Sequence, residues 1–228
     1  MKFHYTNLEI CHNATGMIVV VDVIRAFTNA AYAFSRGAKE IYPVSTVEEA
    51  LQFKAQCPGA LACGEVGGIP PNGFDFGNSP TQTITLDLNG RSIVQRTGAG
   101  TQGIVRSLNA NIMLATSLVV ASATAKYILK HAPDSVSFVI TGQLSDGSGD
   151  EDLACAEYLE LLLNRKQPNP SPYIDRIYKS RDAFLHLDPN LPAFPKSDLE
   201  NCTLVDAFDF AMPVLRENGR FVMRAVTP

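Results

Sequence analysis

Tryptophan is absent from this 228-residue sequence, and its 19 basic and 23 acidic side chains include no run of lysine and arginine. A surface without a basic run argues against nucleic acid or an anionic membrane as a partner. No apolar run is long enough to cross a bilayer, and the first residues lack the charged and apolar regions of a secretory leader. We therefore expect a soluble protein that has neither a membrane nor a nucleic-acid partner.

The five cysteines are odd in number, widely scattered and never arranged as a C-x-x-C pair. This argues against a disulfide framework and against a zinc knuckle, so we expect a reduced, cytoplasmic protein. A hydrophobic fraction of 46% over this length is enough for a full core, in one or two domains. Nothing in the composition fixes the oligomeric state, and a homo-oligomer stays open.

Buried strands alternate with helices through the first two thirds of the chain. Residues 17–23 form a continuous apolar, β-branched run, typical of a strand buried on both faces. Further strands are expected at 39–44, 61–64, 111–116 and 136–141, with helices at 26–35, 46–56, 100–109, 121–130 and 151–164. This repetition predicts a layered α/β/α architecture with a largely parallel or mixed sheet.

Two regions depart from that alternation. Residues 84–88 and 92–96 flank Asn89-Gly90, a strong hairpin signal, so antiparallel pairing is expected there. After the proline-punctuated segment that begins at Gln167, the chain changes character. We expect an α/β core over residues 1–166 and a C-terminal helical extension or small cap over 167–228, with a strand at 220–226. The extension could also be part of the same domain.

The segment GEVGGIPPNGFDFGNSP, residues 64–80, contains five glycines and three prolines. A loop with this backbone chemistry builds a site more often than it merely connects two elements. It carries Glu65, Asp75, Asn78 and Ser79, and the rings on either side of Asp75 could fix that carboxylate as a base or metal ligand. The alternative is a solvated loop whose acids face water.

The GEVGG and GFDFGNSP motifs resemble the signature of the 2-phosphosulfolactate phosphatase family. Four more segments match that family in order: VDVIRAFT, GAKEIYPV, RTGAGTQG and EDLACAEYL. The resemblance implies a magnesium-dependent phosphatase of the coenzyme M biosynthesis type, and it supports Glu151 and Asp152 as metal-site residues. Two positions depart from the family, Ala99 and Val120, where many members have asparagine. The reaction class is therefore expected to persist, with either 2-phosphosulfolactate or a changed substrate.

Acids follow several predicted strands, and ligands of open α/β sheets bind beyond the carboxyl ends of the strands. Asp22 and Glu65 both follow strands, and with Asp75 they are our candidate catalytic residues and metal ligands. Carboxylates without histidine or cysteine partners suit Mg²⁺, which takes only one or two of them together with substrate oxygens. For Asp22, simple capping of the following helix is the alternative.

Cations must accompany these acids if a phosphorylated anion is to bind. Arg25 and Arg96 are the candidates, although Arg25 could instead pair with a surface acid. The glycine-rich loop after Arg96 could hold an anion through backbone N–H groups at a helix N-terminus, or could be only a tight turn. The remaining candidate substrate-binding residues are Thr97, Gly98, Gly100, Thr101, Asn78 and Ser79.

The sequence thus favours magnesium-dependent hydrolysis of a phosphate monoester on a small acidic metabolite. Two alternatives remain. One is an enzyme that uses the same metal and phosphate site for phosphoryl transfer or isomerisation. The other is a non-catalytic sensor of small anions. An acidic, glycine-rich turn that includes Asp146 could bind a cation or simply begin the helix at 151.

Overall fold

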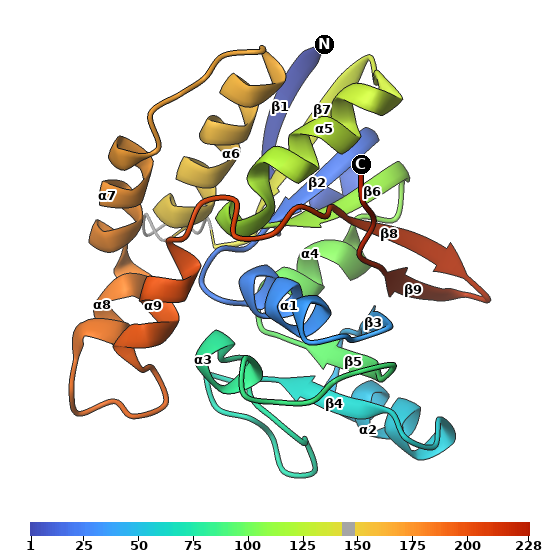
Figure 1. Cartoon of the computed structure of the whole chain (residues 1–228). Coiled ribbons are helices and arrows are strands. Elements are labelled where there is room, and N and C mark those ends of the chain that lie inside the picture. The colour runs from blue at the N-terminus through green and yellow to red at the C-terminus, as the bar shows by residue number, and fades with distance from the viewer. Residues whose placement is uncertain (143–148) are drawn as a thin grey trace.

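The computed structural model describes residues 1–142 and 149–228, so Asp146 lies outside the described residues. One mixed sheet of nine strands forms the centre of this described part (Figure 1). The strands are β1 (Lys2–Asn7), β2 (Gly16–Val21), β3 (Glu40–Pro43), β4 (Leu61–Gly64), β5 (Ser92–Arg96), β6 (Ala110–Thr116), β7 (Ser135–Ile140), β8 (Met212–Glu217) and β9 (Arg220–Met223). Their order across the sheet is β1-β7-β2-β6-β8-β9-β3-β5-β4.

The sheet consists of two parallel groups joined by an antiparallel hairpin. In the first group β1, β7, β2 and β6 run parallel, and in the second β3, β5 and β4 do. The β8–β9 hairpin lies between them and pairs antiparallel with β6 on one side and with β3 on the other. Strand β2 has neighbours along both edges and helices over both faces, which explains its unbroken apolar sequence.

Helices cover both faces of this sheet, so the expected three-layer α/β/α architecture is confirmed. On one face α1 (Ala26–Ser35) and α4 (Gly100–Arg106) pack over alternate β2 residues such as Ile18 and Val20. On the other face α5 (Ala121–His131) and α6 (Asp150–Leu163) pack over Val19 and Val21. The period-two alternation of β2 side chains thus divides the core into two layers. Helix α2 (Val47–Gln56) covers β4 and β5.

The C-terminal part of the chain contributes both helices beside the sheet and strands within it. Helices α7 (Ser171–Lys179), α8 (Arg181–Leu187) and α9 (Lys196–Cys202) lie together beside α6, on the left of Figure 1, and α9 reaches α3 (Pro80–Thr83). The chain then returns to form β8 and β9 in the middle of the sheet. Two short 3-10 turns, Cys11–Asn13 and Leu118–Val120, complete the elements. The strand expected at 220–226 is thus the shorter β9.

The prediction of a β-hairpin around Asn89-Gly90 is wrong. Residues 84–88 form no strand, and β5 pairs in parallel with β3 and β4 instead. Both edges of β5 are therefore occupied, and the turn packs on the end of α1, where the Gly90 N–H donates to the Gly37 carbonyl at 2.8 Å. Tertiary pairing overrides the local turn signal here. Strands β1 and β8 were not predicted, because neither has an unbroken apolar run.

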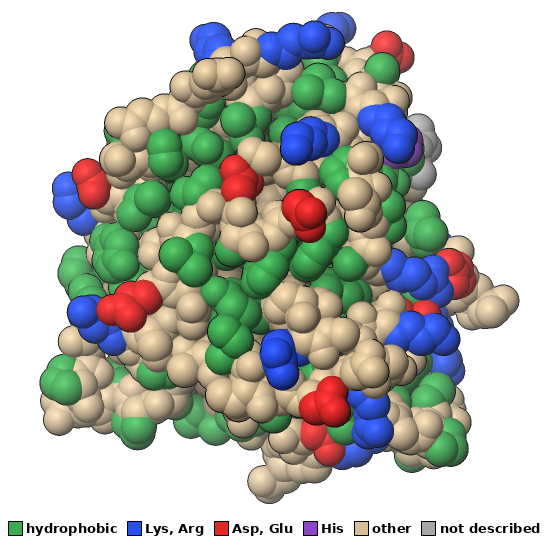
Figure 2. Space-filling view, in the orientation of Figure 1, with side chains coloured by type: hydrophobic (Ala, Val, Ile, Leu, Met, Phe, Trp, Pro, Cys, Tyr) green, Lys and Arg blue, Asp and Glu red, His purple; other side chains and the backbone are tan. Residues whose placement is uncertain are grey.

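Charges of both signs are interspersed on the face shown in Figure 2, which agrees with the balanced composition. None of the helices in the described ranges has both the length and the apolar character that crossing a bilayer would require.

Candidate active site

The carboxyl ends of β2, β4 and β5 meet at one cavity of about 340 Å³, which α8 and the segment before α9 close from the other side. This convergence joins acids and glycines that lie far apart in sequence. The residues that line it include Asp22, Arg25, Glu65, Asn78, Thr97, Gly98, Ala99, Asp182, His186 and Phe194.

Asp22 is buried at the end of β2. One carboxylate oxygen accepts the Ala26 N–H at 2.8 Å, and the other accepts the Thr141 hydroxyl at 3.3 Å. The first bond satisfies the first N–H of α1 and fixes the carboxylate at the cavity, although the N-cap residue of α1 is Arg25 and not Asp22. Burial raises the pKa of Asp22 to about 6, and the nearby Glu65 and Asp182 charges add to this increase.

Asp152 and Glu151 begin α6 behind Asp22. Asp152 accepts three hydrogen bonds, from the Val23 N–H at 2.7 Å, the Gly142 N–H at 2.9 Å and the Thr141 hydroxyl at 3.1 Å. It therefore ties the ends of β2 and β7 together. Burial and the neighbouring Glu151 raise the pKa of Asp152 well above its usual value. Burial also raises the pKa of Glu151 to about 7, and its Oε2 atom is buried with no hydrogen-bond partner among residues 1–142 and 149–228.

Glu65 holds two glycine-containing segments at the cavity wall. Its Oε1 atom accepts the Gly98 N–H at 2.5 Å and its Oε2 atom accepts the Gly68 N–H at 2.8 Å. Both carboxylate oxygens therefore already serve the backbone. Glu65 therefore holds these two loops in position and also places a negative charge at the cavity.

The glycine-rich loop, residues 97–103, uses several of its own N–H groups internally. Thr101 accepts the Thr97 N–H at 2.9 Å and donates its own N–H to the Thr97 hydroxyl at 3.1 Å. A Cβ atom on Gly100 would lie 2.7 Å from both Asp22 Oδ2 and Ala26 Cβ. Glycine at this position thus lets the loop approach the Asp22 carboxylate closely.

Among the described residues that line the cavity, Arg25 is the one lysine or arginine, and its side chain is buried. Its Nη1 atom donates to Asp198 Oδ2 at 2.8 Å, and its guanidinium lies 5.0 Å from the centre of the Phe194 ring. Carbonyls of Ala193 and Gly68 accept further bonds at 3.0 and 3.3 Å. Arg25 therefore does pair with an acid, as the alternative expected, but the pair is buried and not on the surface.

Asp75 lies outside the cavity. Its carboxylate pairs with Lys54 Nζ at 2.7 Å and accepts the Ala62 N–H at 2.7 Å, and its side chain is 30% exposed. The expected fixation of Asp75 as a base or metal ligand finds no geometric support, because the β4 backbone turns this side chain toward α2. Asp75 instead connects the loop to α2, whereas Asn78 of the same motif lines the cavity.

Two other candidates support the site without lining it, and neither of the two departures from the family does so. Arg96 donates to the Glu65 carbonyl at 2.7 Å and to the Ser45 carbonyl at 3.3 Å. Ser79 caps α3 and donates to Asp198 at 2.8 Å. Val120 is fully buried in the core, so this departure from the family cannot contact a substrate, whereas Ala99 does line the cavity.

Sequence reasoning missed the residues that the C-terminal helices supply. Asp182 and His186 lie on α8 and Phe194 precedes α9, all at the cavity. His186 Nδ1 lies 3.0 Å from the Pro195 carbonyl, and burial lowers the pKa of His186. No local motif marks these positions. An acid in the first turn of a helix, such as Asp182, is too common a feature to indicate a site.

The acids do not form a closed metal cage. Within residues 1–142 and 149–228, no group of three or more His, Cys, Asp or Glu side chains is arranged so that it could hold a metal ion. The carboxylates at the cavity nevertheless supply only oxygen atoms, the ligands preferred by hard cations.

Known proteins resemble this chain over most of its length. Residues 4–217 match the family model described as 2-phosphosulpholactate phosphatase. A Bacillus subtilis protein named "Probable 2-phosphosulfolactate phosphatase" is 36% identical over 200 residues, covering 87% of each chain. Proteins of the same name are 42% identical in Carboxydothermus hydrogenoformans, over 64% of this chain and 60% of that protein, and 30% identical in Thermoplasma volcanium, over 86% and 88%.

Fold, cavity and relatives together define an α/β enzyme that hydrolyses phosphoric monoesters. Within that class, the chain belongs to the 2-phosphosulpholactate phosphatase family.

Proposed function

We propose that this enzyme is a magnesium-dependent phosphatase whose substrate is a small phosphorylated acid such as 2-phosphosulfolactate. The observation that carries the proposal is the meeting of Asp22, Glu65 and Asp182 with the anchored Arg25 around one cavity. A volume of about 340 Å³ suits a small metabolite, since ligand pockets commonly start at about 300 Å³. The names of the relatives point to the same substrate class.

The residues fit a magnesium ion held by few protein ligands. Asp22 and Asp182 line the cavity, and Glu65 and Asp182 both raise the pKa of Asp22, so a cation would relieve the repulsion among these acids. Mg²⁺ commonly takes only one or two carboxylates and keeps waters and substrate oxygens, which does not require a cage of three acids. When bound, it would neutralise phosphoryl oxygens and orient a water molecule.

Asp22 and Asp182 would hold the ion, and Glu151 and Asp152 would act from behind them. Asp152 fixes the strand ends through its three hydrogen bonds and thereby positions the Thr141 hydroxyl that also contacts Asp22. Glu151 lies in the same buried region, and a cation bound there would favour the charged form of this acid, whose pKa is otherwise raised to about 7. This arrangement would favour a divalent over a monovalent cation.

Arg25 and Asn78 would bind the acidic substrate. Phe194 and Asp198 hold the guanidinium in place, and the N–H groups that Asp198, Ala193 and Gly68 do not engage can donate to phosphate, carboxylate or sulfonate. Asn78 is buried, lines the cavity and has an Oδ1 atom that accepts no hydrogen bond from the residues that the structure describes.

In the reaction, the oxygen of a water molecule attacks phosphorus while the ester P–O bond breaks and the alcohol leaves. A cavity carboxylate takes the proton that the water loses and passes it to the leaving alkoxide. Asp22 is the acid placed for proton transfer, because its carboxylate lines the cavity and burial raises its pKa to about 6.

Free phosphate released from phosphorylated three- and four-carbon acids, measured with magnesium and with a chelator, tests this proposal. Hydrolysis that needs magnesium supports it. Binding of such acids without phosphate release would favour a sensor, and turnover only with an acceptor other than water would favour a transferase. We further infer a reducing, cytoplasmic location from the five free cysteines, four of which are buried.

A further inference from the structure

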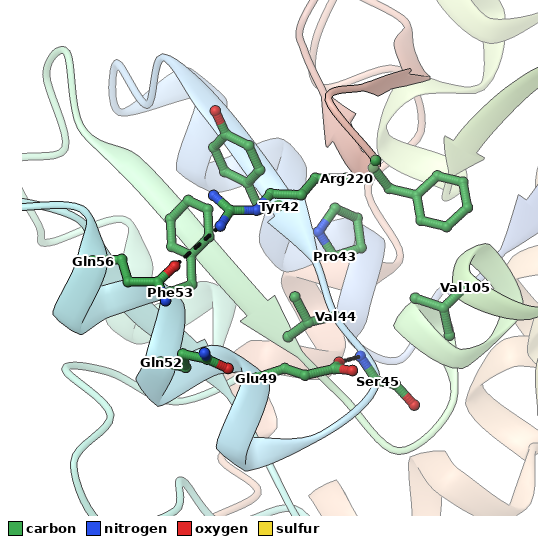
Figure 3. A pocket seen from close by; sticks show the side chains of 12 residues that line it. Tyr42, Pro43, Val44, Ser45, Glu49, Gln52, Phe53, Gln56, Val105 and Arg220 are labelled. Atoms are coloured by element: carbon green, nitrogen blue, oxygen red, sulfur yellow. Dashed lines mark hydrogen bonds between the residues drawn. The ribbon is translucent and has the colours of Figure 1, made fainter.

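A second hollow, which we call the α2 groove, lies away from the active-site cavity and is larger, at about 490 Å³ (Figure 3). It is bounded by the end of β3, by α2, by α4 and by the turn of the β8–β9 hairpin. Its volume is within the range of ligand pockets, from about 300 to about 1,000 Å³.

The α2 groove has one apolar and one polar wall. Figure 3 shows Pro43, Val44 and Val105 on the side of β3 and α4, and Gln52 and Gln56 on the side of α2. An occupant with an apolar body and a polar group would match both walls. A purely apolar ligand would leave the side-chain amides of Gln52 and Gln56 facing it without a hydrogen-bond partner from the ligand.

Arg220 supplies the positive charge of the polar wall. Its guanidinium lies 5.0 Å from the centre of the Phe53 ring and donates to Gln56 Oε1 at 3.2 Å. The Phe53 ring in turn packs against Tyr42, with 4.5 Å between centroids. This stack restrains the guanidinium of Arg220, whose planar set of N–H donors can form two parallel hydrogen bonds to one carboxylate. The carboxylate of Glu49 also lines the groove, but it is engaged in the capping box of α2.

The floor of the α2 groove touches residues that hold the active-site loop. The Ser45 carbonyl accepts bonds from Gln102 Nε2 at 3.0 Å and from Arg96 Nε at 3.3 Å. Gln102 Nε2 also donates to the Thr97 carbonyl at 3.0 Å, and Arg96 donates to the Glu65 carbonyl. A ligand that moves Ser45 would therefore act on both sides of the cavity wall where Gly98 meets Glu65.

We propose that the α2 groove is an effector site for a small amphipathic carboxylic acid, with the carboxylate on Arg220 and the apolar body against Pro43, Val44 and Val105. Occupation of the groove is transmitted through Ser45 to the loop that begins at Thr97. The site is independent of the phosphatase chemistry, because none of its lining residues lines the active-site cavity.

Indole-3-acetate is a suitable probe, and indole-3-ethanol is its matched neutral control. An NMR titration of the whole ¹⁵N-labelled protein should show saturable shifts at the amides of α2 and of residues 219–221. The Thr97 and Gly98 amides should shift in the same titration, because they lie along the Ser45 connection. The neutral alcohol should bind at least about tenfold more weakly, since it lacks the charge-assisted hydrogen bonds.

Arg220→Gln should lower the affinity for indole-3-acetate about tenfold or more while leaving the unliganded spectrum outside the groove unchanged. Arg216→Gln is the matched control, because Arg216 lies on the same hairpin, stacks on Phe221 at 5.8 Å and does not line the groove. Equal affinity in the two variants, or no saturable shift at millimolar probe, would overturn the site. Binding that leaves Thr97 and Gly98 unshifted would overturn the coupling. These readouts do not depend on whether the enzyme hydrolyses the proposed substrate.

Discussion

The buried ion pair between Arg25 and Asp198 gives the most quantitative prediction. Asp198 is fully buried and accepts from Arg25 through Oδ2, while its Oδ1 atom accepts the Ser79 hydroxyl at 2.8 Å and the Thr81 N–H at 2.9 Å. In Asp198→Asn, the amide oxygen can keep the latter two bonds, whereas the NH₂ group must face the Arg25 guanidinium. The substitution therefore removes mainly the ion pair and leaves a buried arginine uncompensated.

Removal of one partner of a buried ion pair costs about 3 to 5 kcal/mol. For a chain of this size, each kcal/mol lowers Tm by about 2 to 4 °C, so Asp198→Asn should lower it by about 6 to 20 °C. Urea unfolding measures the loss in the free energy of unfolding, and thermal melting measures the fall in Tm. The KM of the phosphorylated substrate should also rise, since Arg25 loses the partner that fixes it at the cavity.

Glu200→Gln is the matched control, because Glu200 pairs with Lys196 on the same helix at 3.3 Å but both side chains are more than half exposed. Such a pair contributes at most about 0.5 kcal/mol. The double variant Arg25→Met with Asp198→Asn should be more stable than Asp198→Asn alone, because no uncompensated charge remains. A stability loss for Asp198→Asn no larger than that of the control would refute the reasoning.

Three further outcomes follow from the placement of the acids. Asp75→Asn should keep kcat within about twofold and cost about 1 kcal/mol or less, as expected for a half-exposed ion pair, and a large fall in kcat would show that Asp75 is catalytic. Gly100→Ala should lower kcat about tenfold or more and reduce Tm, because its Cβ would displace the Asp22 carboxylate; a variant with unaltered kinetics would contradict the close approach. The metal-free protein should lose stability as pH rises from about 4 to about 7, because Asp22 and Glu151 bind their protons more tightly in the folded than in the unfolded state. Urea midpoints across that range, with chelator present, should fall with pH, and flat midpoints would contradict the burial of these acids.

Local sequence signals were sufficient to predict those helices and strands whose formation depends on their own residues. The apolar run of β2, the capping residues of α2 and the acids at the start of α6 each carry their own physical cause. The convergence of Asp22, Glu65 and Thr97 also followed from one rule, that ligands bind beyond the carboxyl ends of strands.

The remainder depends on contacts between distant segments, which no local pattern encodes. Asp75 has an unusual setting in sequence, yet the β4 backbone directs it to Lys54. Asp182 and Asp198 look ordinary in sequence and reach the site only because α8 and α9 fold back over it. The Asn89-Gly90 turn failed as a hairpin signal for the same reason, since β5 already had two partners.

The central claim is that the cavity around Asp22 performs magnesium-dependent hydrolysis of a phosphorylated acid. The most direct test measures phosphate release from 2-phosphosulfolactate by the unaltered enzyme and by Asp22→Asn, each in magnesium and in chelator. We expect turnover by the unaltered enzyme in magnesium alone and a loss of about a hundredfold or more in kcat for Asp22→Asn, the low end of the effect of a positioned acid–base group. Undiminished kcat in Asp22→Asn, or full activity in chelator, would contradict the claim.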